Sequence, residues 1–170
     1  MKIVTWNINS VRARLERLVE FLNTRSPDVL CLQELKCTDE QFPREEVKAL
    51  GYHVETYGQK TYNGVAILSK APITDVVRGV GDGDEQARVI AGTTFGVRVV
   101  DIYAPNGQSL TSPAYTYKLD WYARLSRWLR GATRPVVLLG DFNVAPTELD
   151  TWDPALWDGQ VLASAKEREA

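Results

Sequence analysis

The chain has 170 residues, of which 44% are apolar and 25% charged, an ordinary composition for a globular domain with a buried core. A net charge of −2 neither requires nor excludes a polyanionic partner, and no stretch reaches the ~20 apolar residues of a membrane span. Two cysteines and one histidine are too few for a Cys/His zinc site. The N-terminus runs directly into an apolar strand, so we expect a cytoplasmic protein with one domain over residues 1–170.

The first part of the chain alternates strand and helix. Residues 2–9 are predicted to form a buried strand, and Ser10 is the expected N-cap of the helix that follows. The apolar residues of this helix share one face: Val11, Leu15, Leu18 and Leu22. The turn at 26–28 ends the helix before a second apolar strand at 29–34. This order favours a sheet covered by helices.

The middle of the chain is rich in strands. Four strand-like segments are separated by turn residues: 52–57, 64–69, 88–95 and 97–104. The last two are nearly contiguous and are predicted to pair as an antiparallel hairpin. The only histidine, His53, lies in an alternating pattern and is expected at or near the surface.

A second helix is predicted at about 114–130, followed by a strand at 136–143. Its wide apolar face should be substantially buried: Leu119, Trp121, Tyr122, Leu125, Trp128 and Leu129. Near the C-terminus, residues 163–169 have the pattern of a helix just beginning. The whole pattern predicts an α/β protein with a mixed sheet and helices packed on it.

Three of the apolar strands end in polar side chains, which are Asn7, Glu34, and the pair Asp141 and Asn143. Ligands collect at the carboxyl ends of strands in open α/β sheets. Two carboxylates and two amides suit a hard divalent cation and a phosphoryl group, which predicts metal-dependent hydrolysis of a phosphate ester. The structural alternatives are a salt bridge for Glu34 and an Asx turn for Asp141 and Asn143.

Five segments, in this order, resemble the motifs of the exonuclease III class of abasic-site (AP) endonucleases, within the endonuclease/exonuclease/phosphatase superfamily. They are 5–13 (TWNINSVRA), 32–36 (LQELK), 62–70 (YNGVAILSK), 101–107 (DIYAPNG) and 140–146 (GDFNVAP). The resemblance implies a four-layer α/β sandwich, with two sheets packed face to face and helices outside. Family members carry a further Asp and a late Asp-His pair that find no match here. We therefore expect a fold that is incomplete at the C-terminus, with the first sheet and part of the second.

The resemblance also implies roles for the residues at the strand ends. Glu34 would bind the metal, with Asn7 supporting it through a neutral oxygen. Asp141 would orient and deprotonate the attacking water, and Asn143 would donate to the developing charge. Asp141 and Asn143 are also expected among the metal ligands. Carbonyl, amide and carboxylate oxygens suit Mg²⁺ and also Mn²⁺.

Four further residues are expected to contact the substrate. The resemblance places Tyr103 in the site as a catalytic residue that contacts the phosphate, although a core position is the ordinary alternative for a strand tyrosine. Asn106 would donate to the same phosphate or its neighbour. Lys36 and Arg88 are candidates for steering the DNA backbone, with solvated surface charges as the alternative.

The resemblance therefore implies a monomeric, Mg²⁺-dependent DNA-repair nuclease of base excision repair. It would cut double-stranded DNA 5′ to abasic sites and trim 3′ ends. Two alternatives stay open at this point. The chain could be a non-catalytic fragment with residual metal or DNA binding. It could also be another phosphodiesterase or phosphatase of the superfamily, such as a sphingomyelinase-like, inositol-phosphatase-like or deadenylase-like enzyme.

Overall fold

A computed structural model describes residues 1–170 and contains two four-stranded sheets with helices. The strands are β1 (Ile3–Asn7), β2 (Val29–Gln33), β3 (His53–Tyr57), β4 (Val65–Ser69), β5 (Thr74–Arg78), β6 (Val89–Thr94), β7 (Val97–Tyr103) and β8 (Val136–Asp141). The helices are α1 (Leu15–Arg25), α2 (Arg44–Lys48), α3 (Pro113–Arg130), α4 (Pro154–Trp157) and α5 (Ala165–Glu169). The predicted mixed α/β fold is confirmed. None of these helices combines the length and the apolar character needed to cross a bilayer.

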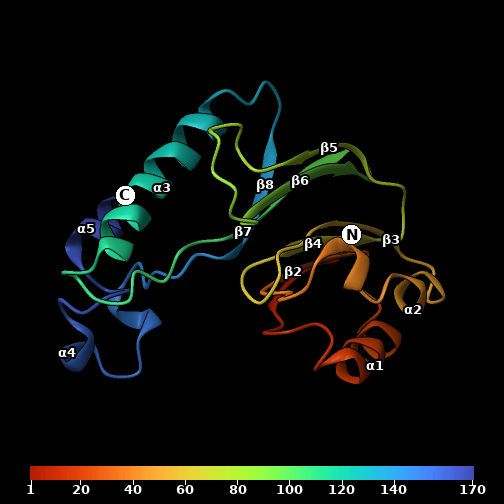
Figure 1. The fold of residues 1–170 in the computed structure, drawn as a ribbon, viewed down its shortest axis with the longest axis horizontal. Coiled ribbons are helices and arrows are strands. Elements are labelled where there is room, and N and C mark those ends of the chain that lie inside the picture. Colours follow the sequence, from red (N-terminus) through yellow and green to blue (C-terminus); the bar gives the residue numbers. More distant parts are fainter. The chain divides into compact units, whose positions relative to one another are not determined.

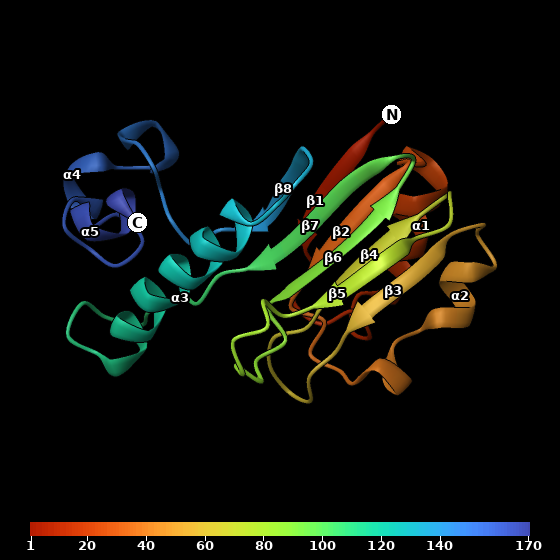
Figure 2. The same ribbon diagram turned by 90° about the horizontal axis from the view of Figure 1, so that it is seen from above.

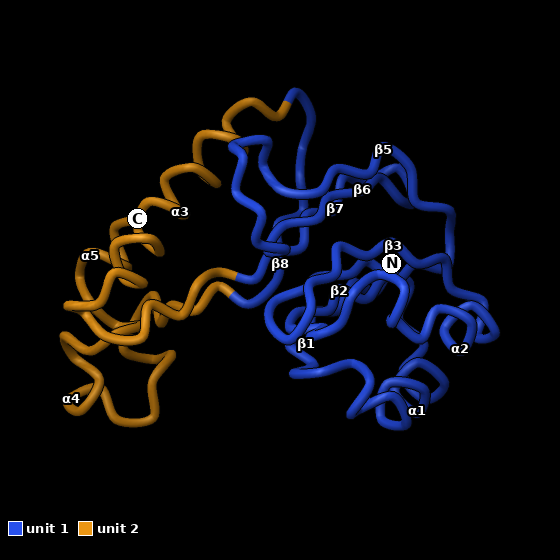
Figure 3. The backbone as a smooth tube through the Cα atoms, viewed as in Figure 1, with its two compact units in different colours: residues 1–103, 133–141 blue, residues 104–132, 142–170 orange.

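The chain divides into two compact units (Figure 3). Unit 1 comprises residues 1–103 and 133–141 and contains both sheets with α1 and α2. Unit 2 comprises residues 104–132 and 142–170 and contains α3, α4 and α5. This division into compact units does not test the expectation of a single domain over residues 1–170, which stays a prediction.

The first sheet has the order β1-β2-β4-β3. β1 and β2 pair in parallel through the crossover helix α1, as the strand–helix–strand pattern predicts. β4 pairs antiparallel with β2 on one side and with β3 on the other. Because β1 and β2 run in the same direction, the residues after Asn7 and after Gln33 emerge at one edge of this sheet.

β2 is buried on both of its faces, and the alternation of its side chains explains how. Leu30 and Leu32 join the core that includes residues of α1 and α2. Val29 and Cys31 join a second core, which includes Ile90 and other residues of the second sheet. Unit 1 therefore has three layers, with α1 and α2 on one side of the first sheet and the second sheet on the other (Figure 1).

The second sheet has the order β5-β6-β7-β8. β6 and β7 form the predicted antiparallel hairpin, whose turn at Phe95 and Gly96 has positive φ values of 51° and 74°. β7 pairs in parallel with β8, which brings Tyr103 beside Asp141 at the end of the ladder. β5, which the sequence pattern did not predict, is the edge strand next to β6 (Figure 2).

The first helix begins later than predicted. Residues 11–14 form turns, and α1 starts at Leu15 without a side-chain cap. The backbone N–H groups of Ser10 and Val11 donate to the carbonyl oxygens of Glu34 and Leu35, at 2.7 and 3.2 Å. The chain here continues the contact between β1 and β2 beyond the strands, and Ser10 has a positive φ of 82° rather than the extended backbone of an N-cap.

In unit 2, α3 matches its predicted range closely. The Ser112 side chain caps it by accepting from the backbone N–H of Tyr115. Trp121, Tyr122 and Leu125 of the predicted apolar face are buried, whereas Leu119, Trp128 and Leu129 are half-buried. The short helix expected at 163–169 is α5, which a reciprocal capping box between Ser164 and Glu167 begins.

Candidate active site

Sharp turns follow the strands that carry the predicted site residues. Asn9, Glu34 and Lys36 have positive φ values of 46°, 56° and 53°, a left-handed conformation that is uncommon for residues with a side chain. The turn after β2 is held by backbone bonds from Leu35 and Lys36 to the carbonyl oxygens of Gly64 and Asn63. Backbone strain of this kind persists only where neighbouring contacts enforce it, and it concentrates at functional sites. Here the turn carries Glu34 out of a strand whose five residues are all buried.

Asn7, Glu34, Tyr103 and Asp141 form one group in unit 1, the carboxylate cluster. The Asn7 side-chain nitrogen Nδ2 donates to Glu34 Oε1 and to Asp141 Oδ2, each at 2.8 Å. Those two carboxylate oxygens are therefore separated by no more than twice that distance. The Tyr103 hydroxyl also hydrogen-bonds with Glu34. The structure thus brings together four of the side chains that were predicted to share a site.

Glu34 is held as a carboxylate by its neighbours. Its burial acts to raise the pKa, but hydrogen bonds from Asn7, Lys36 and Tyr103 outweigh burial and keep the pKa below its ordinary value. Lys36 Nζ lies 2.9 Å from Glu34 Oε2 and 2.6 Å from the Asn9 side-chain oxygen. Both oxygens of Glu34 therefore have a donor, and the group stays ionised near neutral pH.

Tyr103 is held as a neutral phenol. Burial, reinforced by the negative charge of Glu34, raises the pKa of Tyr103 to about 12. Arg88 lies against this residue: its guanidinium is 4.9 Å from the ring centroid, and Nη1 donates to the Tyr103 carbonyl at 3.0 Å. Arg88 Nε also donates to Gln86 Oε1 at 2.7 Å. The structure therefore shows Arg88 holding Tyr103 in place, and its expected contact with substrate stays a prediction.

The carboxylate cluster fits a magnesium site in its chemistry. Glu34 and Asp141 offer anionic oxygens, and both side chains are only partly buried, so water can complete the coordination. No group of three or more His, Cys, Asp or Glu side chains in residues 1–170 is placed so that it could hold a metal ion, but Mg²⁺ commonly binds through one or two carboxylates. Asn7 differs from its expected role, because its nitrogen faces the carboxylates and its oxygen accepts from the backbone N–H of Asn9 at 3.1 Å. In this orientation Asn7 clamps the two carboxylates and does not present an oxygen to a metal.

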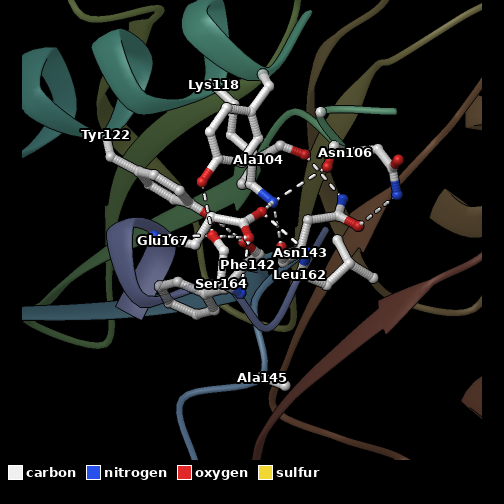
Figure 4. A network of polar contacts seen from close by, with 12 residues as sticks. Ala104, Asn106, Lys118, Tyr122, Phe142, Asn143, Ala145, Leu162, Ser164 and Glu167 are labelled. Atoms are coloured by element: carbon white, nitrogen blue, oxygen red, sulfur yellow. Dashed lines mark hydrogen bonds and ion pairs between the residues drawn. The ribbon is translucent and has the colours of Figure 1, made fainter. Parts of the chain in front are cut away.

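Asn106 and Asn143 meet in unit 2 and form the amide cluster (Figure 4). Asn106 Nδ2 lies 3.4 Å from Asn143 Oδ1, and Asn143 Nδ2 donates to the Ala104 carbonyl at 2.8 Å. Asn143 has a positive φ of 48°. Lys118 Nζ donates to the backbone carbonyl oxygens of both asparagines, at 3.1 Å for Asn106 and 2.6 Å for Asn143. The amide cluster is joined to the carboxylate cluster by the chain itself, since Ala104 follows Tyr103 and Phe142 follows Asp141.

Two buried polar groups of the structure were not predicted from the sequence. Gln33, which precedes Glu34, donates from Nε2 to Asp101 Oδ1 at 2.6 Å and to Thr5 Oγ1 at 2.9 Å. Burial raises the pKa of Asp101 well above its ordinary value, although hydrogen bonds from Gln33 and the backbone partly offset that effect. A polar residue inside an otherwise apolar strand was the signal that could have found this pair.

The second missed group is the ion pair between Lys118 of α3 and Glu167 of α5, whose side chains are fully buried. Lys118 lies on the same face of α3 as the apolar residues that predict its burial. The prediction that His53 lies at or near the surface is confirmed, because this residue is exposed on β3.

Comparisons with known proteins agree with this architecture. The model of the endonuclease/exonuclease/phosphatase family matches residues 4–160. The exodeoxyribonuclease III of Haemophilus influenzae is 38% identical over 88% of this chain and 60% of that protein, and a Bacillus subtilis exodeoxyribonuclease is 32% identical over 100% and 69%. The chain thus spans 60% of the length of the Haemophilus relative.

Solved structures resemble the chain along almost its whole length. A 3′ phosphatase of Neisseria, NExo, bound to a product DNA hairpin, has a TM-score of 0.97 at 44% identity and matches 99% of this chain and 68% of that one. An AP endonuclease from Archaeoglobus fulgidus has a TM-score of 0.95 at 36% identity, with 99% and 67% matched. The chain belongs to the endonuclease/exonuclease/phosphatase family.

Proposed function

We propose that this chain carries the metal-binding carboxylates and the water-activating group of a Mg²⁺-dependent DNA nuclease of the exonuclease III type. The observation that carries the proposal is the single Asn7 amide nitrogen bonded to both Glu34, which follows β2, and Asp141, which ends β8. Two carboxylates held this close repel each other unless a cation or a donor lies between them. A site for a divalent cation explains why both are brought to the same place.

Each residue has a chemical task in this proposal. Glu34 and Asp141 would hold Mg²⁺, which when bound supplies positive charge to the phosphate oxygens. Asp141 also accepts a proton from the attacking water, whose oxygen forms the new bond to phosphorus while the bond to the leaving oxygen breaks. Tyr103, kept neutral by its surroundings, would contact the phosphate, and donating to it requires that its single hydroxyl proton leave Glu34. Asn143 and Asn106 donate from their amides as negative charge develops.

DNA is the proposed substrate because of what several similar family members are named for. The Haemophilus and Bacillus relatives are named exodeoxyribonucleases, and the Neisseria structure holds a product DNA hairpin. A Dictyostelium discoideum relative at 30% identity is named a DNA-(apurinic or apyrimidinic site) endonuclease. We therefore propose double-stranded DNA with abasic sites and 3′ ends, with Lys36 near its backbone.

A second candidate function is removal of a 3′ phosphate. The Neisseria relative is described as a 3′ phosphatase and also as a 3′-5′ exonuclease, and it is 44% identical to this chain. In both reactions water attacks phosphorus and a deoxyribose oxygen leaves, so the two candidates differ in whether that phosphorus also carries a second nucleotide, and not in the catalytic residues.

Cleavage of a labelled duplex with one tetrahydrofuran abasic analogue tests the proposal. A cut 5′ to the analogue that requires Mg²⁺ and stops with EDTA supports the endonuclease. Release of phosphate only from a 3′-phosphorylated duplex supports the phosphatase, and binding without either product supports a non-catalytic fragment. Asp141→Asn should lower the cleavage rate by about 10²–10⁴-fold, as expected for loss of a general base. Asp75→Asn, which removes an exposed carboxylate from β5 of the same sheet, is the control.

A further inference from the structure

The middle of α3 contains a lysine with no exposure to solvent. The side chains of Lys118 and Glu167 are both 0% exposed, and Lys118 Nζ lies 2.5 Å from Glu167 Oε1. Taking two charges out of water is costly, and a buried ion pair often gives no net gain over apolar packing. Stability alone is therefore a weak reason for this pair.

All three N–H donors of Lys118 are used within the protein. An ammonium group has three N–H donors. Lys118 directs them to three acceptors inside unit 2, which are Glu167 Oε1 and the backbone carbonyl oxygens of Asn106 and Asn143. A lysine beside predicted phosphate-binding residues would ordinarily be read as a phosphate ligand. Here its contacts instead fix two main-chain segments to one point (Figure 4).

The Glu167 carboxylate also accepts hydrogen bonds from residues other than Lys118. Oε1 accepts from the Leu162 N–H at 3.0 Å, and Oε2 accepts from the backbone N–H and the hydroxyl of Ser164, at 3.1 and 2.5 Å. Burial acts to raise the pKa of Glu167, but the bonds from Lys118, Ser164 and Leu162 outweigh it and keep the carboxyl ionised. The counter-charge of Lys118 is therefore permanent near neutral pH.

Contacts around the ion pair hold the same loop. Tyr122, one helical turn after Lys118, donates from its hydroxyl to the Phe142 carbonyl. The Ala145 N–H donates to the Leu162 carbonyl at 2.7 Å, and Arg168 Nε donates to the Ala145 carbonyl at 3.0 Å. Consecutive parts of the loop 142–145 are thus tied to α3 or to the segment that leads into α5. The left-handed backbone of Asn143 lies within this tied loop.

We propose that Lys118, with Glu167 as its counter-ion, is a positioning residue that presets Asn106 and Asn143 as one amide pair for a single phosphate. This inference rests on the proposed phosphodiester hydrolysis. Lys118 does not touch the substrate; it acts through the two carbonyl groups that it binds. Displacing a preorganised donor by about 1 Å can cost on the order of 10²-fold in rate, so the effect belongs in kcat.

The test compares Lys118→Met and the nearly isosteric Glu167→Gln with the parent chain. Glu169→Gln and Lys166→Met are matched controls, because both residues are exposed on α5 beside Glu167. On the abasic duplex with Mg²⁺, we expect Lys118→Met to lower kcat by about 10–100-fold with KM nearly unchanged. Glu167→Gln should lower kcat in the same direction while the chain stays folded by its thermal melt.

A combined variant separates positioning from general stabilisation. If Lys118 acts through Asn106 and Asn143, Lys118→Met added to a chain that already carries Asn106→Ala and Asn143→Ala should cost no more than about 2-fold beyond those two changes alone. Losses that multiply, or an unchanged kcat in folded Glu167→Gln, overturn the inference.

A parent chain that does not cut DNA refutes the proposed function and leaves positioning to a second readout. The side-chain amide NMR signals of Asn106 and Asn143 should both shift in Glu167→Gln and stay in place in Glu169→Gln. Signals that do not move in Glu167→Gln overturn the positioning role, whatever the activity of the parent.

Discussion

Asp101 gives the sharpest prediction for stability. Its side chain is fully buried in β7, where Gln33 donates to it at 2.6 Å, and burial raises its pKa well above the ordinary value. The folded state therefore keeps a proton that the unfolded chain releases near pH 4. Because the folded state binds more protons, its stability falls as pH rises through this window, by about 1.4 kcal/mol per pH unit. The loss ends only when the folded carboxyl itself ionises.

The substitution Asp101→Asn removes this linkage, because an amide does not titrate and has nearly the same shape. The free energy of unfolding of the variant minus that of the parent should therefore rise by about 1.4 kcal/mol per pH unit above pH ~4 and then level off. Urea unfolding followed by tryptophan fluorescence at half-unit pH steps measures this difference, provided that the m-values agree. Taking the difference cancels the titration of all other groups.

A difference that stays flat from pH 4 to pH 8 would refute the reasoning, since it would mean that Asp101 is ionised in the folded protein as it is in the unfolded chain. Asp75→Asn, on the exposed edge strand β5, reports the effect of removing a carboxylate that is not buried in the sheet.

Two further predictions concern β8 and Glu34. Gly140→Ala should destabilise the chain by about 3–5 kcal/mol in the same urea assay, because a Cβ there would lie 2.0 Å from the Ile102 carbonyl oxygen. Gly79→Ala is the control for a glycine with positive φ in open space, with φ of 70° against 141° at Gly140, and should cost about 1–2 kcal/mol; equal costs would contradict the steric argument. Lys36→Gln removes a hydrogen bond and a positive charge that help to hold the pKa of Glu34 down, so the acid limb of the cleavage rate should move to higher pH. An acid limb that stays in place would show that Glu34 ionisation does not set it.

Much of unit 1 could be predicted because its strands are apolar and its turns carry clear signals. The β6–β7 hairpin and the parallel β1–β2 pair both follow the sequence pattern. β5 could not be predicted, because an edge strand buries little and its residues are mostly exposed, with a register shift between Thr74 and Val77. Its identity as a strand comes from pairing with β6, which local sequence does not encode.

The start of α1 was wrong for a related reason. Ser10 is a good capping residue by type, but its backbone N–H bonds to Glu34, 24 positions along the chain, and this contact sets the local conformation. The prediction that polar side chains at the ends of the strands lie together was correct for Asn7, Glu34 and Asp141. It could not show that Asn7 would present its nitrogen, because the orientation of an amide depends on the surrounding donors and acceptors.

The buried ion pair between Lys118 and Glu167 could not be predicted from the sequence for a different reason. Lys118 occupies an apolar face of α3 together with Tyr115 and Tyr122, so its spacing does indicate burial. Its partner Glu167 lies 49 positions away in a short helix, and only the folded chain brings the two together. Long-range partners of buried charges are not encoded in any local window.

The two-sided burial of β2 restricts where the chain can change in length. Inserting or deleting one residue there would exchange the sets of side chains that enter the two cores and would displace Glu34 by about 3.3 Å along the strand. The connection from β5 to β6 carries no such restriction, because Gly81, Asp82 and Gly83 are all exposed. Natural insertions and deletions should therefore accumulate in that connection and spare β2, where a shift of one residue would displace Glu34 from the carboxylate cluster and disturb both hydrophobic cores at once.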